Sequence, residues 1–119
     1  MTAITTVTLI EAAARAAADK KAEDPIALDV SERLPLADAF FIATGNSDRQ
    51  VVAIAEGIEE ALHGLGVKAL RREGVREGRW ALLDFGDLIV HIMHQEERAY
   101  YALERLWKDC PVIALPDDL

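Results

Sequence analysis

Residues 80–93 carry the sequence WALLDFGDLIVHIM, in which two apolar runs are separated by Gly86 and Asp87. A two-residue loop with glycine at its first central position is typical of a tight β-hairpin. The stretch therefore predicts two antiparallel strands, at 80–85 and 88–93, whose register is set by Gly86 and Asp87. In this register Phe85 lies opposite Leu88, and the pairing of the other residues follows from that pair.

The predicted pairing divides the side chains of the hairpin between two faces, because partners across the pair share a face and neighbours along a strand alternate. One face is wholly apolar and is expected to belong to the core; it carries Ala81, Leu83, Phe85, Leu88, Val90 and Ile92. The other face mixes aromatic, aliphatic, thioether, carboxylate and imidazole groups; it carries Trp80, Leu82, Asp84, Ile89, His91 and Met93. Such a mixture is typical of the centre of a protein interface, and cover by a helix or by the C-terminal segment of the same chain is the alternative.

Outward from the hairpin, the sequence predicts three helices and three further strands. The helices are expected to begin at a capping box formed by Thr8 and Glu11, at a second capping box formed by Ser47 and Gln50, and near His94. The further strands are expected at residues 26–30, 38–44 and 67–73, the last of them near a sheet edge. This order predicts an α/β fold with a mixed five-stranded sheet and helices mainly on one face.

The C-terminal part of the chain is expected to form a docked helix followed by a tail. Apolar and aromatic residues at helical spacing predict the side of the third helix that docks on the core; they are Tyr100, Leu103, Leu106 and Trp107. Residues 109–119 contain Pro111 and Pro116 and show no periodicity. We therefore expect a single domain over residues 1–108 and a loosely attached tail over residues 109–119.

Composition restricts the partners and the location of the protein. The 119 residues include 13 Lys and Arg against 21 Asp and Glu, a formal net charge of −8. Phosphate contacts depend on clustered cations, so this balance argues against direct nucleic-acid binding and favours a basic protein as partner. The single cysteine, Cys110, suits a reducing compartment, and the first residues predict neither a signal peptide nor a membrane span. A cytoplasmic location without membrane contact is expected.

The sequence contains few of the combinations on which catalysis depends. No G-x-S-x-G motif occurs, and Cys110 lies far from any histidine in the sequence. His91 and His94 are three residues apart, so in an extended strand they point to opposite faces and do not form a metal pair. No catalytic residue, metal or cofactor is therefore expected.

The turn formed by residues 45–47, Gly-Asn-Ser, leaves an enzymatic alternative open. Backbone amides at a helix N-terminus can bind a phosphate, and nucleotidyltransferases use such turns. These enzymes also need two carboxylates at i and i+2 of a strand to hold Mg²⁺. None of the predicted strands has that pair, so a plain helix cap is the preferred interpretation, with passive anion binding and nucleotide transfer as alternatives.

Three segments together resemble one known family. Residues 37–51, 78–93 and 98–107 are similar, in order and spacing, to the ribosomal silencing factor family, also called RsfS or Iojap-like, and the likeness extends from about Leu9 to Lys108. The resemblance implies a non-enzymatic translation repressor that binds the large ribosomal subunit through ribosomal protein L-fourteen and prevents the small subunit from joining. It also implies a homodimer when the protein is free, and a fold related to nucleotidyltransferases that lacks the catalytic carboxylates.

The resemblance assigns roles to residues of the hairpin. The family pattern G-x-W-x-L-x-D falls on Trp80, Leu82 and Asp84, and the family's Gly-Asp turn falls on Gly86 and Asp87. The binding residues expected on this basis are Trp80 as the anchor, Leu82, Ile89 and Met93 as apolar contacts, Asp84 as the partner of a cation, and His91 on the same face. A nucleotide-binding or nucleotidyltransferase-like enzyme and a homodimeric interaction module are the alternatives.

Overall fold

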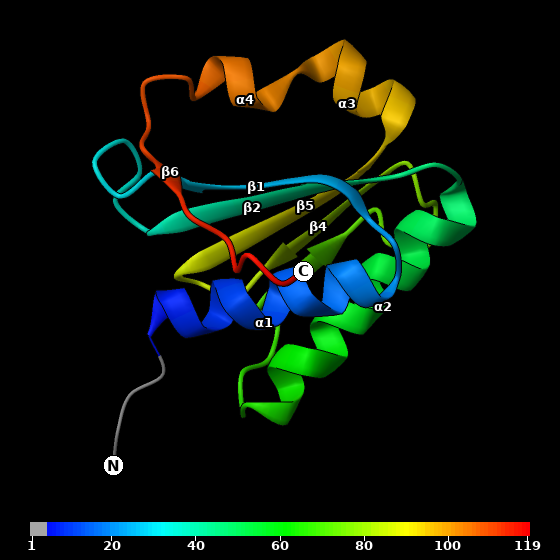
Figure 1. The fold of residues 1–119 in the computed structure, drawn as a ribbon, viewed down its shortest axis with the longest axis horizontal. Helices are drawn as coiled ribbons and strands as arrows, with labels where there is room; N and C mark the ends of the chain where they lie inside the picture. Colours follow the sequence, from blue (N-terminus) through cyan, green and yellow to red (C-terminus); the bar gives the residue numbers. More distant parts are fainter. Residues whose placement is uncertain (1–4) are drawn as a thin grey trace.

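The computed structural model describes residues 5–119, which form one mixed sheet with helices on both faces (Figure 1). The strands are β1 (Glu23–Asp29), β2 (Ala39–Gly45), β3 (Arg71–Glu73), β4 (Trp80–Asp84), β5 (Leu88–His94) and β6 (Val112–Ile113). The helices are α1 (Thr6–Asp19), α2 (Asp48–Gly64), α3 (Gln95–Tyr101) and α4 (Leu103–Leu106). The predicted α/β class and mixed sheet are confirmed, since β2 and β5 run parallel whereas the other neighbouring strands run antiparallel.

The sheet has six strands within the described residues, and the predicted number of five is wrong. The strand order is β3-β4-β5-β2-β1-β6, and the additional strand, β6, lies in the segment 109–119. It pairs with β1 through Ala27 and Ile113 and through Leu28 and Val112. A two-residue strand is too short to show an alternating pattern, so the edge of β1 and not the local sequence specifies it.

The two long helices, α1 and α2, cover one face of the sheet, as the sequence predicts (Figure 1). Each of them buries five residues there, and they share this larger core with Phe41 and Leu83 of the sheet. The segment from α3 to α4 crosses the opposite face, so the helices are not confined to one side. A smaller core lies on that second face; its buried members are Leu28, Val30, Ala37, Phe40, Ile42, Met93, Leu103 and Cys110.

The predicted third helix is interrupted at Ala102, which has a left-handed backbone conformation with φ of +45°. Because the interruption rotates the residues after it, the predicted docking residues do not share one side. Leu103 is buried and Trp107 is partly buried, whereas Tyr100 and Leu106 are exposed. The prediction that Tyr100 and Leu106 belong to the core is therefore wrong.

Of the two predicted capping boxes, the structure confirms the second and contradicts the first. The hydroxyl of Ser47 accepts a hydrogen bond from the backbone N–H of Gln50 at 3.1 Å, as the second capping box predicts. The first helix begins earlier than predicted, because Thr5 and not Thr8 is its cap and accepts from the Thr8 N–H at 3.2 Å. Thr5 offers the same hydroxyl three residues earlier, and the longer helix forms more backbone hydrogen bonds.

None of the helices within residues 5–119 is long and apolar enough to cross a membrane.

The edge strand β3 is shorter than predicted: it covers only Arg71–Glu73 of the range 67–73. It lies at the sheet edge, as the sequence predicts.

Candidate functional site

The hairpin of β4 and β5 has the pairing that its two-residue turn predicts. The Phe85 N–H donates to the Leu88 carbonyl at 2.9 Å, and Trp80 lies opposite Met93. Gly86 has φ of +89°, a conformation that glycine adopts without strain, and its N–H donates to the Asp84 carboxylate at 2.8 Å. The side chain of Asp84 therefore stabilises the turn that fixes the register.

The two faces of the hairpin differ as the pairing requires. All six residues of the predicted core face are buried against α1 and α2; they are Ala81, Leu83, Phe85, Leu88, Val90 and Ile92. The second face brings the six candidate site residues together, but only four reach the surface: Trp80, Leu82, Asp84 and Ile89 are partly exposed. His91 is 7% exposed and Met93 is completely buried. Met93 belongs to the smaller core with Leu103 of α4, below the segment from α3 to α4, so it is not available as a contact residue in this conformation.

Two tyrosines of α3 extend this surface, and the sequence did not indicate them as surface residues. The ring centroids of Trp80 and Tyr101 are 4.8 Å apart, and those of Tyr101 and Tyr100 are 5.0 Å apart. Tyr101 is 46% exposed and Tyr100 is 82% exposed. Neighbouring residues of a helix differ in direction by about 100°, so the pair of tyrosines alone does not show which of them is exposed. We define the Trp80 surface as Trp80, Leu82, Asp84, Ile89 and Tyr101.

The indole of Trp80 forms a hydrogen bond with the buried side chain of His91. Its Nε1–H donates to His91 Nδ1 at 3.1 Å, and the two ring centroids are 6.0 Å apart. Burial lowers the pKa of His91 to about 4, so the imidazole is neutral near neutral pH and Nδ1 can accept the hydrogen bond. The orientation of the most prominent aromatic group of the surface is therefore coupled to a buried histidine.

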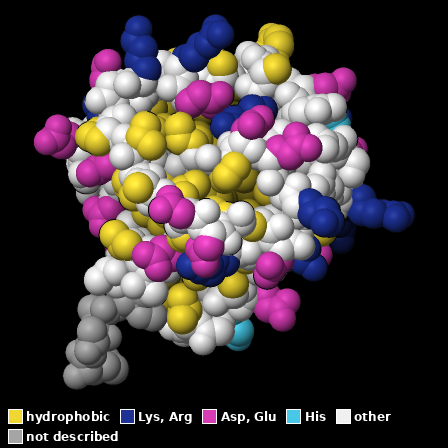
Figure 2. All heavy atoms as spheres, in the orientation of Figure 1, with side chains coloured by type: hydrophobic (Ala, Val, Ile, Leu, Met, Phe, Trp, Pro, Cys, Tyr) yellow, Lys and Arg dark blue, Asp and Glu magenta, His cyan; other side chains and the backbone are white. Residues whose placement is uncertain are grey.

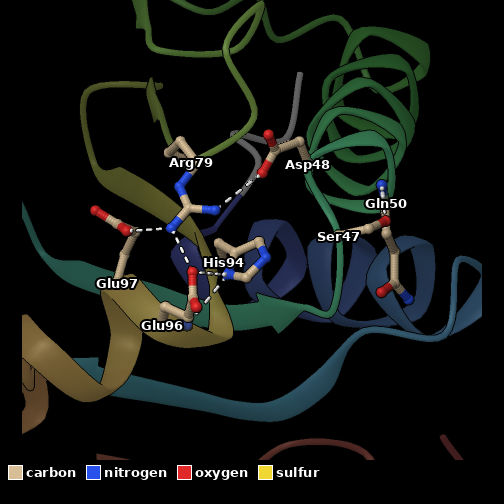
Figure 3. Close-up of polar contacts among 7 residues, drawn as sticks. All are labelled: Ser47, Asp48, Gln50, Arg79, His94, Glu96 and Glu97. Atoms are coloured by element: carbon tan, nitrogen blue, oxygen red, sulfur yellow. Dashed lines mark hydrogen bonds and ion pairs between the residues drawn. The ribbon is translucent and has the colours of Figure 1, made fainter.

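An ion-pair cluster fixes α3 beside Trp80 (Figure 3). The guanidinium of Arg79, the residue before Trp80, pairs with Asp48 at 3.3 Å, with Glu96 at 2.8 Å and with Glu97 at 2.7 Å. The hydrogen bond and positive charge of Arg79 lower the pKa of Glu96. His94 Nδ1 accepts from the Glu96 N–H at 3.1 Å and so caps the helix. One arginine thus joins the first turns of α2 and α3 to the strand that carries Trp80.

The charged side chains near the Trp80 surface are of both signs, and its cations are paired with carboxylates: Arg71, opposite Asp84 on β3, pairs with Glu73 at 3.0 Å. Arg79 is engaged by carboxylates, and Arg98 is held by Glu104 at 3.3 Å and by the Thr44 hydroxyl at 2.7 Å. Figure 2 shows acidic side chains spread over the visible side of the molecule, with hydrophobic groups exposed between them. With a net charge of −8, the molecule is electrostatically complementary to a basic partner.

The turn at residues 45–47 is a helix cap. The Asn46 N–H donates to the side-chain oxygen of Gln50 at 2.6 Å, and the Ser47 hydroxyl accepts from the Gln50 N–H. The side-chain amide of Asn46 donates to the carboxylate of Glu23 at 2.7 Å, and the Asp48 carboxylate lies in the first turn of α2. Side chains of the same protein thus use the polar groups of this turn, and its two carboxylates disfavour an anion.

The two histidines of β5 have separate environments, because His91 bonds to Trp80 and His94 caps α3. Within residues 5–119, no three His, Cys, Asp or Glu side chains are grouped so that they could hold a metal ion.

Comparison with known proteins identifies relatives over nearly the whole chain. A family model described as ribosomal silencing factor during starvation matches residues 3–119. The ribosomal silencing factor RsfS of Bacillus subtilis is 46% identical over 107 residues, which cover 90% of this chain and 91% of that protein. RsfS of Halalkalibacterium halodurans is 44% identical over 107 residues, 90% of this chain and 92% of that protein. A crystal structure of a Chromobacterium violaceum protein superposes with a TM-score of 0.86 at 37% identity and covers 88% of each chain.

Proposed function

The chain belongs to the ribosomal silencing factor family, and we propose that it represses translation by binding the large ribosomal subunit and preventing the small subunit from joining. The family name supports a regulatory role in translation and not an enzymatic one. The proposal goes further, to the partner and to the step that is blocked.

The observation that carries the proposal is the partly exposed tryptophan at the centre of the Trp80 surface. Tryptophan and tyrosine are enriched among the residues that contribute most to protein binding. Trp80 lies on a strand in the sheet and is supported by His91 and Tyr101, so little conformational freedom is lost when a partner binds. A rigid aromatic anchor on an acidic domain is suited to a basic protein surface.

We propose ribosomal protein L-fourteen of the large subunit as that partner. Trp80 would insert into its surface, Leu82 and Ile89 would flank the indole, and the second carboxylate oxygen of Asp84 would pair with a cation of the partner. Buried His91 and Met93 would support the surface from below and not touch the partner. We also propose a cytoplasmic location, where bacterial ribosomal subunits are found.

The proposed mechanism is steric. A 13.1 kDa domain bound where the small subunit docks excludes it without any chemical step. The block lasts as long as the domain remains bound, so repression depends on the dissociation rate. The proposed mechanism requires a packing surface and no cofactor.

We also propose that the free protein forms a homodimer through the same aromatic surface. Trp80, Tyr101 and Tyr100 leave an apolar area exposed in the monomer, and a second copy can cover it. Dimer formation and ribosome binding then compete. If so, Trp80→Ala yields a monomer by light scattering.

Sedimentation with purified ribosomal subunits tests the proposal. Wild-type protein is expected to sediment with the large subunit and, when added first, to reduce the formation of joined ribosomes. Trp80→Ala should weaken binding by about 2 kcal/mol or more, because truncation of a central aromatic anchor has this effect. Leu36→Ala is the matched control, because Leu36 is 87% exposed in the loop before β2. Trp80 lies beside the other end of β2, since it pairs with Met93 and Met93 pairs with Thr44. Unchanged sedimentation of a folded Trp80→Ala variant would exclude the Trp80 surface, and normal subunit joining in the presence of bound wild type would exclude the steric mechanism.

A further inference from the structure

His91 has an unusual hydrogen-bonding state. Within residues 5–119, its Nε2 is the buried side-chain nitrogen or oxygen for which no protein group provides a hydrogen-bond partner. The other ring nitrogen, Nδ1, accepts from the Trp80 N–H. A neutral imidazole that accepts at Nδ1 carries its proton at Nε2, so the unpartnered atom is an N–H donor. Burial of such a donor lowers the stability of the folded protein.

The surroundings of His91 do not require a histidine for packing. On the neighbouring strands it lies opposite Leu82 and Ile42, and the ring of Phe40 meets it edge-on with centroids 4.9 Å apart. An aliphatic side chain of similar volume would fill this place without a buried N–H. Among the residues that the structure describes, Trp80 is the one hydrogen-bond partner of the His91 side chain.

We infer that His91 is a positioning residue for the Trp80 surface, and that it supports binding although its buried N–H lowers the stability of the fold. The inference rests on the proposed function, in which Trp80 is the anchor. His91 accepts a hydrogen bond from the single donor of the indole, the Nε1–H, and thereby fixes the direction in which the ring faces the partner.

This arrangement also defines the chemistry of the group that binds there. Because the indole N–H is bonded to His91, it is not available to an acceptor on the partner. The carbon atoms of the ring remain for the partner: aliphatic groups can pack on them, and the ring face attracts the ammonium or guanidinium groups of Lys and Arg. The group that contacts Trp80 is therefore apolar or cationic.

Two substitutions separate positioning from structural support. His91→Leu removes both ring nitrogens and keeps the volume similar, whereas His91→Asn places a carbonyl oxygen near the position of Nδ1 and can still accept from Trp80. For stability, we expect the Tm of His91→Leu to equal or exceed that of the wild type and the Tm of His91→Asn to be lower. For affinity to the large subunit, we expect the opposite order, with His91→Leu weakened about tenfold and His91→Asn weakened less.

The same measurements contain the outcomes that contradict the inference. If affinity follows Tm across the variants, or if His91→Leu binds like the wild type, His91 has only a structural role. In a Trp80→Phe background, which lacks the N–H, His91→Leu should have less than about a twofold further effect, and an undiminished effect would also overturn the inference. Trp80→Ala distinguishes failure of the proposed function from failure of the inference about His91. If Trp80→Ala leaves binding unchanged, the proposed role of the Trp80 surface fails. If Trp80→Ala weakens binding but His91→Leu does not, only the positioning role of His91 fails.

Discussion

The two faces of the sheet are covered in different ways. α1 and α2 each bury five residues on one face, whereas α3 buries none and α4 buries only Leu103 on the other. The first face is held by hydrophobic packing. On the second face α3 is held at its start by the ion pairs of Arg79 and the cap of His94, and Trp80 remains partly exposed beside it. The larger core lies on the first face, whereas the second face combines a smaller core with the partly exposed surface that we propose for binding.

Truncation of a residue buried beneath α1 and α2 should have the largest effect on stability. Phe41 is completely buried between the sheet and the long helices. Phe41→Ala should lower the free energy of unfolding by about 3–5 kcal/mol, because a cavity replaces the ring. Urea denaturation measures this change, with exposed Tyr100→Ala as the control that should leave stability nearly unchanged. Similar losses in both variants would contradict the division between the faces.

The second prediction concerns the pH dependence of stability. Burial lowers the pKa of His91 from 6.5 to about 4. Below pH 6.5 the unfolded chain binds a proton at His91 that the folded protein does not bind until the pH approaches 4, so stability falls as the pH decreases through this window. One proton contributes at most about 1.4 kcal/mol per pH unit.

His91→Leu is the matched control for this titration. The carboxyl groups whose pKa values are lowered, Asp29, Glu96 and Asp118, are present in both proteins, so their contribution cancels in the difference. Denaturation at several values between pH 7 and pH 4.5 should give a weaker pH dependence for the variant. Parallel curves would show that His91 titrates normally and is not buried as described.

A smaller effect is expected at the interruption between α3 and α4. Ala102 has φ of +45°, which glycine adopts without the steric penalty of a Cβ. Ala102→Gly should therefore raise the free energy of unfolding by about 1 kcal/mol, measured by chemical denaturation. A decrease would indicate that the segment from α3 to α4 is not held in this conformation.

The smallest effect is expected from the ion pairs of Arg79. Exposed ion pairs contribute little and are screened by salt. Arg79→Gln should lower Tm only slightly, and the difference should shrink at high salt. We expect amide hydrogen exchange in the variant to be faster than in the wild type, with a larger increase in α3 than in α2. An equal increase in all elements would contradict a local role for the ion pairs of Arg79.

The sequence predicts much of this molecule where a local pattern determines the structure. Gly86 and Asp87 fix a hairpin register from which both faces of β4 and β5 follow, and Ser47 with Gln50 marks the start of α2. These features depend on residues that are neighbours in the chain. The family motif falls on the same hairpin, so the candidate surface could be proposed from sequence around Trp80.

The parts that the sequence does not predict depend on distant contacts. β6 forms because Val112 and Ile113 meet the edge of β1, and Met93 is buried because the segment from α3 to α4 crosses its face of the sheet and places Leu103 in the same core. The interruption at Ala102 has no glycine or proline to mark it, so the exposure of Tyr100 could not be derived from spacing. In each case tertiary structure overrides a weak local signal.

The parallel pair at the centre of the sheet has a consequence for how the chain folds. It aligns Ala39 of β2 with Leu88 of β5, and α2, β3 and β4 lie in the chain between the two strands. Closing such a long loop costs entropy that only the finished pairing repays, which makes folding slower than for domains with local contacts. A fragment that ends before residue 88 keeps β1 but lacks β5, the central neighbour of both β2 and β4, and should remain unfolded. We therefore expect the sheet to form as one cooperative unit.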